Sequence, residues 1–138
     1  WNREFVNGPL GLTPGDAKPN GMILGYPVIT SGEFAHRGSF INLLGDRYEE
    51  DRALTSLENQ VSADTPPTFL WHTWDDACVP VENSLLLATA LRKNGVPTEL
   101  HILPSGPHGL SLATAETGVV QEACAGWPDW ATRWLWDL

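Results

Sequence analysis

The sequence has only two cysteines, Cys78 and Cys124, in 138 residues. Two cysteines do not make the disulfide framework that stabilises small secreted domains, so a reducing compartment such as the cytoplasm is favoured. Secretion stays open, because Trp1 resembles an internal residue rather than a true start. No apolar run reaches the roughly 20 residues that a bilayer-spanning helix needs, and the first residues lack the pattern of a signal peptide.

Basic side chains are also scarce. The chain has 8 Lys and Arg against 17 Asp and Glu, which gives a formal net charge of −9. This charge repels phosphate backbones and anionic lipid heads, so nucleic acid and membrane surfaces are poor partners. No histidine pair has the spacing of a zinc site and no carboxylates cluster along the sequence. We therefore expect no metal.

Short apolar runs bounded by turn residues predict three strands, the first of them buried on both faces of a sheet. These strands are Gly21–Ile29, ending at Pro27, then Thr68–His72 and Thr98–Leu103. One helix is predicted from a cap at or near Asn83 to Asn94, with Leu86, Leu87, Ala90 and Leu91 buried and Gly95 as its stop. Alternating strands and helices are typical of an α/β fold with a mostly parallel, doubly wound sheet and helices on both faces.

The last helix is predicted from Trp127 to Leu138. Its apolar residues recur at helical spacing, at Trp127, Trp130, Trp134 and Leu138, and its indoles are expected to pack on the sheet. Three segments remain between the predicted elements. Residues 1–20 read as a loop or lid-like segment, Thr30–Asp46 as an insertion over the strand ends, and Glu49–Val61 as one helix with Leu54, Leu57 and Val61 on its apolar face.

Two residues that follow predicted strands have the chemistry of a catalytic acid and base. Asp76 comes after the strand that ends near His72, and His108 comes after Thr98–Leu103, 32 residues further on. The carboxyl ends of parallel strands form one edge, where open α/β sheets bind ligands. A triad needs such a carboxylate to fix the tautomer of the imidazole and to stabilise the imidazolium. The order acid then histidine is that of α/β-hydrolases, but the chain contains no G-x-S-x-G nucleophile turn.

Alternatives exist for each candidate. Asp75 competes with Asp76, which is preferred because the D-x-x-V-P spacing lets Val79 and Pro80 pin its loop. Cys78 offers a thiol nucleophile for His108, although a small packing thiol is the preferred interpretation. Structural or solvated roles are expected for the other three histidines, His36, His72 and His101. Trp74 lies beside the expected cleft and is a candidate for substrate binding, with core packing as the alternative.

The chain resembles the acetyl-xylan esterase-like group of α/β-hydrolases, also labelled endo-1,4-β-xylanase-like or esterase/lipase-like. The similar stretches are Tyr26–Thr30, Ala35–Phe40, Asn42–Gly45, Thr65–Thr73, Val79–Ser84 and His108–Leu110. The resemblance implies a serine esterase without a cofactor, which removes small acyl groups from sugar hydroxyls. It assigns the acid to Asp76 and the base to His108, and it places the oxyanion loop and nucleophile serine before Trp1.

Residues 1–138 are therefore expected to be the C-terminal half of one α/β-hydrolase domain of about 250 residues. The expected partners are a small-molecule or sugar ester and the nucleophile-bearing N-terminal half, with a homo-oligomer as a further option. Two other functions stay open. The chain is either a non-catalytic carbohydrate-binding module, in which Trp74 and Thr30–Asp46 hold the sugar, or an assembly fragment of a split hydrolase whose sheet edge promotes pairing.

Overall fold

The computed structural model describes residues 3–13 and 15–138. Three strands form one parallel sheet in the order β1-β2-β3, with bounds β1 Met22–Gly25, β2 Thr68–Thr73 and β3 Thr98–Leu103. The expected parallel sheet is confirmed. The strands that precede Asp76 and His108 are direct neighbours, because Thr73 of β2 lies opposite Leu103 of β3. Both candidate residues thus leave the sheet at the same edge.

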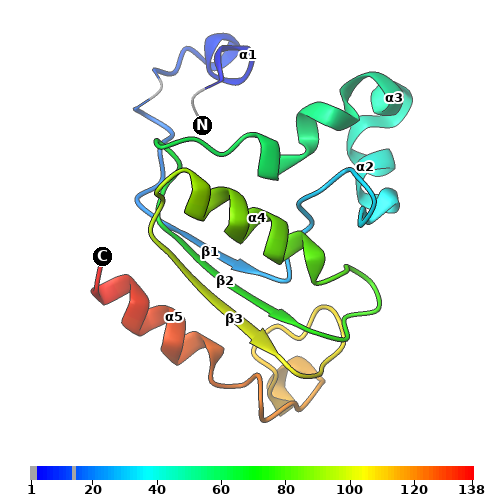
Figure 1. Cartoon of the computed structure of the whole chain (residues 1–138), viewed down its shortest axis with the longest axis vertical. Helices are drawn as coiled ribbons and strands as arrows, with labels where there is room; N and C mark the ends of the chain where they lie inside the picture. The colour runs from blue at the N-terminus through cyan, green and yellow to red at the C-terminus, as the bar shows by residue number, and fades with distance from the viewer. Residues whose placement is uncertain (1–2, 14) are drawn as a thin grey trace.

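Helices cover both faces of the sheet (Figure 1). Helix α4 (Glu82–Lys93) lies on one face and α5 (Trp127–Trp136) on the other. Successive residues of β2 point to opposite faces, as the strand pleat requires. Leu70 packs toward α4 in a cluster with Ile29, Leu87, Leu91 and Val96, whereas Phe69 and Trp71 pack toward α5 with Leu110, Cys124, Ala131 and Trp134. The indole packing expected for the last helix is confirmed.

Helix α4 departs from the sequence prediction at its first turn. Val81, rather than Asn83, occupies the N-cap, and Asn83 is completely buried inside the helix. Its side chain accepts hydrogen bonds from the Ile29 and Thr30 N–H groups and donates to two carbonyls. Asn83, although its type favours helix caps, therefore links α4 to the segment after β1 by hydrogen bonds. Leu86 was also expected to be buried but is 37% exposed.

The single helix expected over Glu49–Val61 is wrong. The chain there breaks into α3 (Tyr48–Asp51), η3 (Arg52–Thr55) and η4 (Leu57–Asn59), with Ser56 in an extended conformation. The Leu57 N–H donates to the Ile29 carbonyl, and the Ser56 hydroxyl accepts from the Ser31 N–H. These bonds to a distant segment replace helical bonds, so Leu54 and Leu57 remain nearly half exposed.

The remaining elements are short. The segment 1–20, expected to be a loop, contains α1 (Glu4–Asn7) and η1 (Gly8–Leu10), where the Gly8 N–H closes one turn on the Glu4 carbonyl; residues 1, 2 and 14 lie outside the described parts. The insertion after β1 contains α2 (Arg37–Leu44) and η2 (Gly45–Arg47), and η5 (Ala115–Thr117) precedes α5. No helix in the described chain is long and apolar enough to cross a bilayer.

Candidate functional site

Asp76 sits in a tight loop directly after β2 and is only 7% exposed. One carboxylate oxygen, Oδ1, accepts the N–H groups of Cys78 at 2.9 Å and Val79 at 3.0 Å. The loop is fixed because Val79 is 1% exposed and packs inward. The loop is therefore held at Val79, as the V-P sequence predicts. With Oδ1 bound to the loop amides, the second oxygen, Oδ2, is directed toward the loop after β3.

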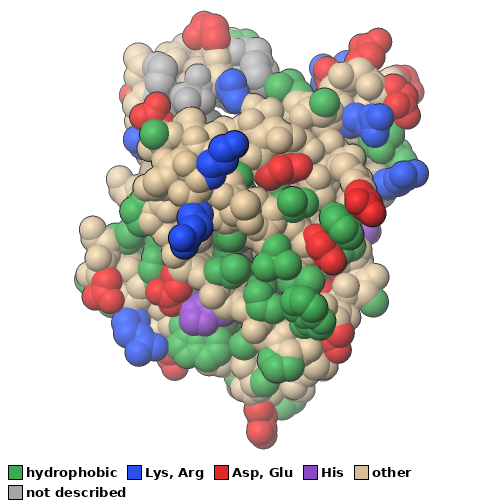
Figure 2. Space-filling model, viewed as in Figure 1, with side chains coloured by type: hydrophobic (Ala, Val, Ile, Leu, Met, Phe, Trp, Pro, Cys, Tyr) green, Lys and Arg blue, Asp and Glu red, His purple; other side chains and the backbone are tan. Residues whose placement is uncertain are grey.

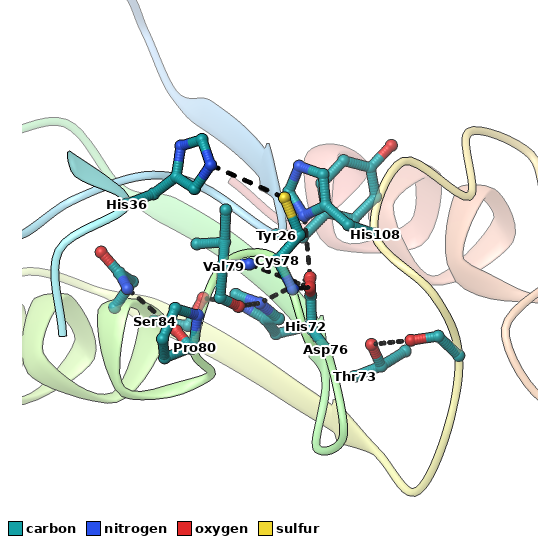
Figure 3. A network of polar contacts seen from close by, with 12 residues as sticks. Tyr26, His36, His72, Thr73, Asp76, Cys78, Val79, Pro80, Ser84 and His108 are labelled. Atoms are coloured by element: carbon teal, nitrogen blue, oxygen red, sulfur yellow. Dashed lines mark hydrogen bonds and ion pairs between the residues drawn. The ribbon is translucent and has the colours of Figure 1, made fainter. Parts of the chain in front are cut away.

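His108 lies on that second loop, and its Nδ1 is 2.8 Å from Oδ2 of Asp76 (Figure 3). A carboxylate only accepts hydrogen bonds, so Nδ1 carries the proton and donates it. The other ring nitrogen, Nε2, then has a free lone pair. The side chain of His108 is 30% exposed. The structure thus brings the two residues predicted from sequence into direct contact, with a basic nitrogen left for a reacting group.

The charge on Asp76 is stabilised despite its burial. Burial would raise the pKa of this carboxyl, but hydrogen bonds from the Val79 N–H, from His108 and from the Cys78 N–H outweigh it and lower the pKa below its usual value. The carboxylate therefore stays ionised at neutral pH. An ionised carboxylate beside Nδ1 favours one tautomer of His108 and stabilises its imidazolium.

His72 on β2 also lies against the carboxylate of Asp76. Its ring is completely buried in β2, with Nδ1 2.8 Å from the Ser84 hydroxyl and Nε2 3.0 Å from the Val79 carbonyl. A carbonyl only accepts, so Nε2 carries the proton, and it also lies 3.3 Å from Oδ2 of Asp76. Burial lowers the pKa of His72, which keeps the ring neutral. The structural role expected for His72 is confirmed, although its contact with Asp76 was not predicted.

Asp75 turns away from His108 and anchors the other loop. Its Oδ1 accepts the Gly106 N–H at 2.8 Å, while the Thr73 hydroxyl donates to the Gly106 carbonyl at 2.7 Å. The bonds from Gly106 and from the Ser105 hydroxyl lower the pKa of Asp75. Side chains at the end of β2 therefore hold both the backbone N–H and the backbone carbonyl of Gly106. Asp75 therefore fixes the backbone of the loop that carries His108.

An open hollow of about 840 Å³ lies in front of His108. The described residues that line it are His36, Asp75, Ala77, Cys78, Ser105, Gly106, Pro107, His108 and Gln121. Cys78 is exposed, which corrects the expectation of a packing thiol, and its Sγ faces Nε2 of His36 at 3.8 Å. Trp74 is 63% exposed and is not among these lining residues, so substrate binding by Trp74 stays a prediction.

The two remaining histidines, His36 and His101, have other partners than Asp76. His101 stacks on Trp130 and contacts Glu99, and His36 bonds Ser39. No group of three His, Cys, Asp or Glu side chains within residues 3–13 and 15–138 is arranged to hold a metal ion. One residue near His108, Tyr26, was missed from sequence. Its signals were its place between Gly25 and Pro27 at a predicted strand end and its place in the similar stretch Tyr26–Thr30.

Comparison with known proteins gives consistent results. The model of the prolyl oligopeptidase family matches residues 27–134. Endo-1,4-beta-xylanase B of Butyrivibrio fibrisolvens is 47% identical over 72% of this chain and 16% of its own length. Acetylxylan esterase of Xylanibacter ruminicola is 38% identical over 75% of this chain and 23% of its own length.

Among solved structures, an acetyl ester-xyloside bifunctional hydrolase from Caldicellulosiruptor lactoaceticus matches with a TM-score of 0.76 and 50% identity, over 86% of this chain and 42% of that one. The chain therefore spans less than a quarter of the two curated relatives and less than half of this structure. Its parallel sheet with helices on both faces is part of an α/β-hydrolase fold, and the resemblance expected from its sequence is confirmed. The chain belongs to the prolyl oligopeptidase family.

Proposed function

We propose that this chain supplies the acid and the base of a serine carboxylic ester hydrolase. The observation that carries the proposal is the contact of 2.8 Å between Oδ2 of Asp76 and Nδ1 of His108 at the open hollow. In the reaction, Nε2 of His108 removes the proton of a serine hydroxyl as this attacks the ester carbonyl. The imidazolium, stabilised by Asp76, then returns the proton to the departing alcohol, and water hydrolyses the acyl-enzyme by the same route.

The nucleophile has to come from a segment outside these residues. The chain has no G-x-S-x-G turn, and several of its serines already have partners, because Ser31 bonds Ser56, Ser39 bonds His36 and Ser84 bonds His72. We propose that the N-terminal half of the same hydrolase supplies it and adds strands beside β1. The outer edge of β1 has no partner strand among the described residues, and Ile23 of β1 is 43% exposed.

An apolar hollow beside that edge supports this arrangement. Its apolar lining residues include Met22, Leu24, Pro27, Val28, Ile29, Leu54, Leu57, Val61 and Leu87. A surface of this kind is stabilised by burial against another element. A second copy of this chain is a less favoured occupant, because only an N-terminal half also brings the nucleophile.

We propose sugar esters with small acyl groups, such as acetylated xylan, as substrates. The names of the relatives, which include acetylxylan esterase and acetyl ester-xyloside hydrolase, support this class. The net charge of −9 disfavours phosphorylated substrates, and basic side chains lie dispersed among acidic ones on the face in Figure 2. Trp74, with its exposed indole, is our candidate for contact with a sugar ring.

The same site does not suit glycoside cleavage. That reaction needs two carboxyl groups on opposite sides of the scissile bond, one of them protonated at working pH. Asp75 and Asp76 are adjacent, both have lowered pKa values, and one bonds Gly106 while the other bonds His108. We therefore propose ester hydrolysis and assign no glycosidase activity to these residues.

A chimera tests the proposal. In it, the segment of the C. lactoaceticus hydrolase that this chain matches is replaced by this chain. We expect the chimera to release acetate from acetylated xylo-oligosaccharides and to react with a fluorophosphonate probe at one serine. A folded His108→Ala chimera that still reacts with the probe and still releases acetate would contradict the proposal. Binding of xylo-oligosaccharides without any turnover, measured by isothermal titration, would favour the carbohydrate-binding alternative.

A further inference from the structure

Tyr26 has an unusual backbone conformation at the end of β1. Its φ angle is +40°, a region that bulky side chains rarely occupy. The Tyr26 N–H still donates to the Trp71 carbonyl of β2, at 2.7 Å. Strand β1 nevertheless ends at Gly25, before the predicted end at Pro27. Such conformations persist only where the surroundings hold them, and they are concentrated at functional sites. We therefore expect the contacts of the Tyr26 side chain to hold this conformation.

The ring of Tyr26 lies against the imidazole of His108. The two ring centroids are 4.8 Å apart with an angle of 67° between the planes, and Figure 3 places the rings side by side above Asp76. The same tyrosine ring meets Trp71 edge-on at 5.0 Å. The imidazole is thus held by Asp76 through Nδ1 and bounded by Tyr26 at its side. Its rotation away from Asp76 is restricted by a ring that is itself fixed by the core.

The hydroxyl of Tyr26 holds the backbone that follows His108. It accepts the Ser111 N–H at 3.1 Å, while the Ser111 carbonyl accepts the Trp127 indole N–H at 2.7 Å. Trp127 stacks on Trp71 at 5.3 Å, so the two side chains that bind Ser111 rest on one buried indole. Ser111 also has a positive φ of +51°. Tyr26, Trp71 and Trp127 thus pack together and fix the backbone of the His108 loop at Ser111.

We propose that Tyr26 is a positioning residue for His108, with its ring limiting rotation of the imidazole and its hydroxyl fixing the loop at Ser111. This inference rests on the proposed function, because it assigns to His108 a geometry that matters for proton transfer. It extends that function to the residue directly after β1, a strand that precedes neither the acid nor the base. The strain at Tyr26 is then the consequence of placing a large ring beside the base.

Two variants separate the contributions of the ring and the hydroxyl. Tyr26→Phe keeps the ring and removes the Ser111 bond, whereas Tyr26→Leu removes both. Tyr48→Leu is the matched control, because Tyr48 is the only other tyrosine and lies on α3. In the chimera we expect Tyr26→Leu to lower kcat by about 10- to 100-fold with KM nearly unchanged, since small misplacements of a catalytic group cost this much. Tyr26→Phe is expected to lie between this variant and the wild type.

A second readout uses the chimera without substrate. The Nδ1 proton of His108, hydrogen-bonded to Asp76, is observed by NMR in the chimera labelled with ¹⁵N-histidine. We expect this signal to be lost or broadened in Tyr26→Leu and retained in Tyr48→Leu and Tyr26→Phe. If Tyr26→Leu does not fold, Tyr26→Phe decides the matter through its kcat. Wild-type kcat and an unchanged Nδ1 signal in both Tyr26 variants would overturn the inference.

The proposed function fails separately. If the His108→Ala chimera keeps its activity, the assignment of the base is wrong whatever Tyr26 does. If His108→Ala is inactive while both Tyr26 variants behave as the wild type, only the positioning role is overturned. A parallel loss of kcat and of stability in urea, with an unchanged His108 signal in the folded protein, would reduce Tyr26 to a structural residue.

Discussion

The two carboxylate oxygens of Asp76 have different partners, and this division explains how one buried residue serves two purposes. Oδ1 binds the amides of its own loop, while Oδ2 meets His108 and lies near His72. The amides fix the direction of the carboxylate before any substrate is present. His108 is therefore held in one tautomer by a group that has little freedom to move.

Replacing Asp76 by asparagine tests this directly. An amide at this position favours the wrong tautomer of His108, so we expect kcat of the chimera to fall by about three to four orders of magnitude with the fold intact. Asp75→Asn is the matched control, because its side-chain oxygen still accepts the Gly106 N–H and its kcat should change far less. Similar losses in both variants would remove the reason for choosing Asp76 as the acid.

Substitution of the histidines tests the base. We expect His108→Ala to abolish ester turnover in the chimera and His36→Ala or His101→Ala to leave most of it, because neither of these rings contacts Asp76. kcat/KM should also fall toward acidic pH, since a protonated imidazole accepts no proton from the nucleophile. A profile that is flat between about pH 5 and 8 would argue against histidine as the base.

His72 gives a prediction on stability. Burial lowers its pKa in the folded protein, so the unfolded chain binds a proton near pH 6.5 while the folded chain does not. Stability from this group is complete above that pH and is lost as pH falls below it, by at most about 1.4 kcal/mol per pH unit. Urea unfolding is measured at pH 7.5 and 5.5, roughly one unit on either side of the reference pKa of histidine. Between these two values the free energy of unfolding should fall more for the wild type than for His72→Gln. Equal drops would contradict a neutral, buried His72.

At the scale of elements, the loops after β2 and β3 are tied to each other at Gly106. Asp75 accepts the Gly106 N–H, and Thr73 donates to the Gly106 carbonyl. A methyl group on Gly106 would lie 2.8 Å from Leu110 and 3.0 Å from Thr73, so no room exists for a side chain. The glycine therefore lets the His108 loop approach the end of β2 closely enough for His108 to reach Asp76.

We accordingly expect Gly106→Ala to destabilise the protein by about 1–3 kcal/mol, because overpacking displaces neighbours in a fixed bend. Esterase activity of the chimera should fall at the same time, since the bend carries His108. Gly15→Ala is the control, as a methyl group there meets no atom within 4 Å. Urea denaturation measures the first effect, and unchanged stability of Gly106→Ala would show that the bend is not closely packed.

The regular elements were largely predictable from sequence because their signals are local. Apolar runs gave the three strands, and helical spacing gave α4 and α5. The encounter of Asp76 and His108 followed from their places after adjacent strands. The broken helix at Ser56 and the buried Asn83 were not predictable, because each is decided by hydrogen bonds to residues 25 or more positions away. The bond of Tyr26 to Ser111 was hidden for the same reason. The contact of His72 with Asp76 joins residues close in sequence, but it depends on how the loop after β2 folds back.

At the scale of the whole molecule, Asp76 and His108, the proposed acid and base, lie at one edge of the sheet, while the apolar hollow flanks β1 and includes Leu24 and Leu57. The described residues thus present two different surfaces. One holds the Asp76–His108 pair beside an open hollow, and the other is the outer edge of β1 with its apolar neighbours. Their arrangement fits a chain that works together with a further segment beside β1.

The isolated 138-residue polypeptide should therefore be inert toward esters. Covalent catalysis needs an activated nucleophile beside the base, and no serine of this chain lies on a G-x-S-x-G turn. We expect neither fluorophosphonate labelling nor turnover of p-nitrophenyl acetate above the level of the His108→Ala chain. The open edge of β1 should also make the polypeptide self-associate, which sedimentation at several concentrations would reveal. Stoichiometric labelling of one serine, with turnover that His108→Ala removes, would contradict the need for a nucleophile from outside these residues.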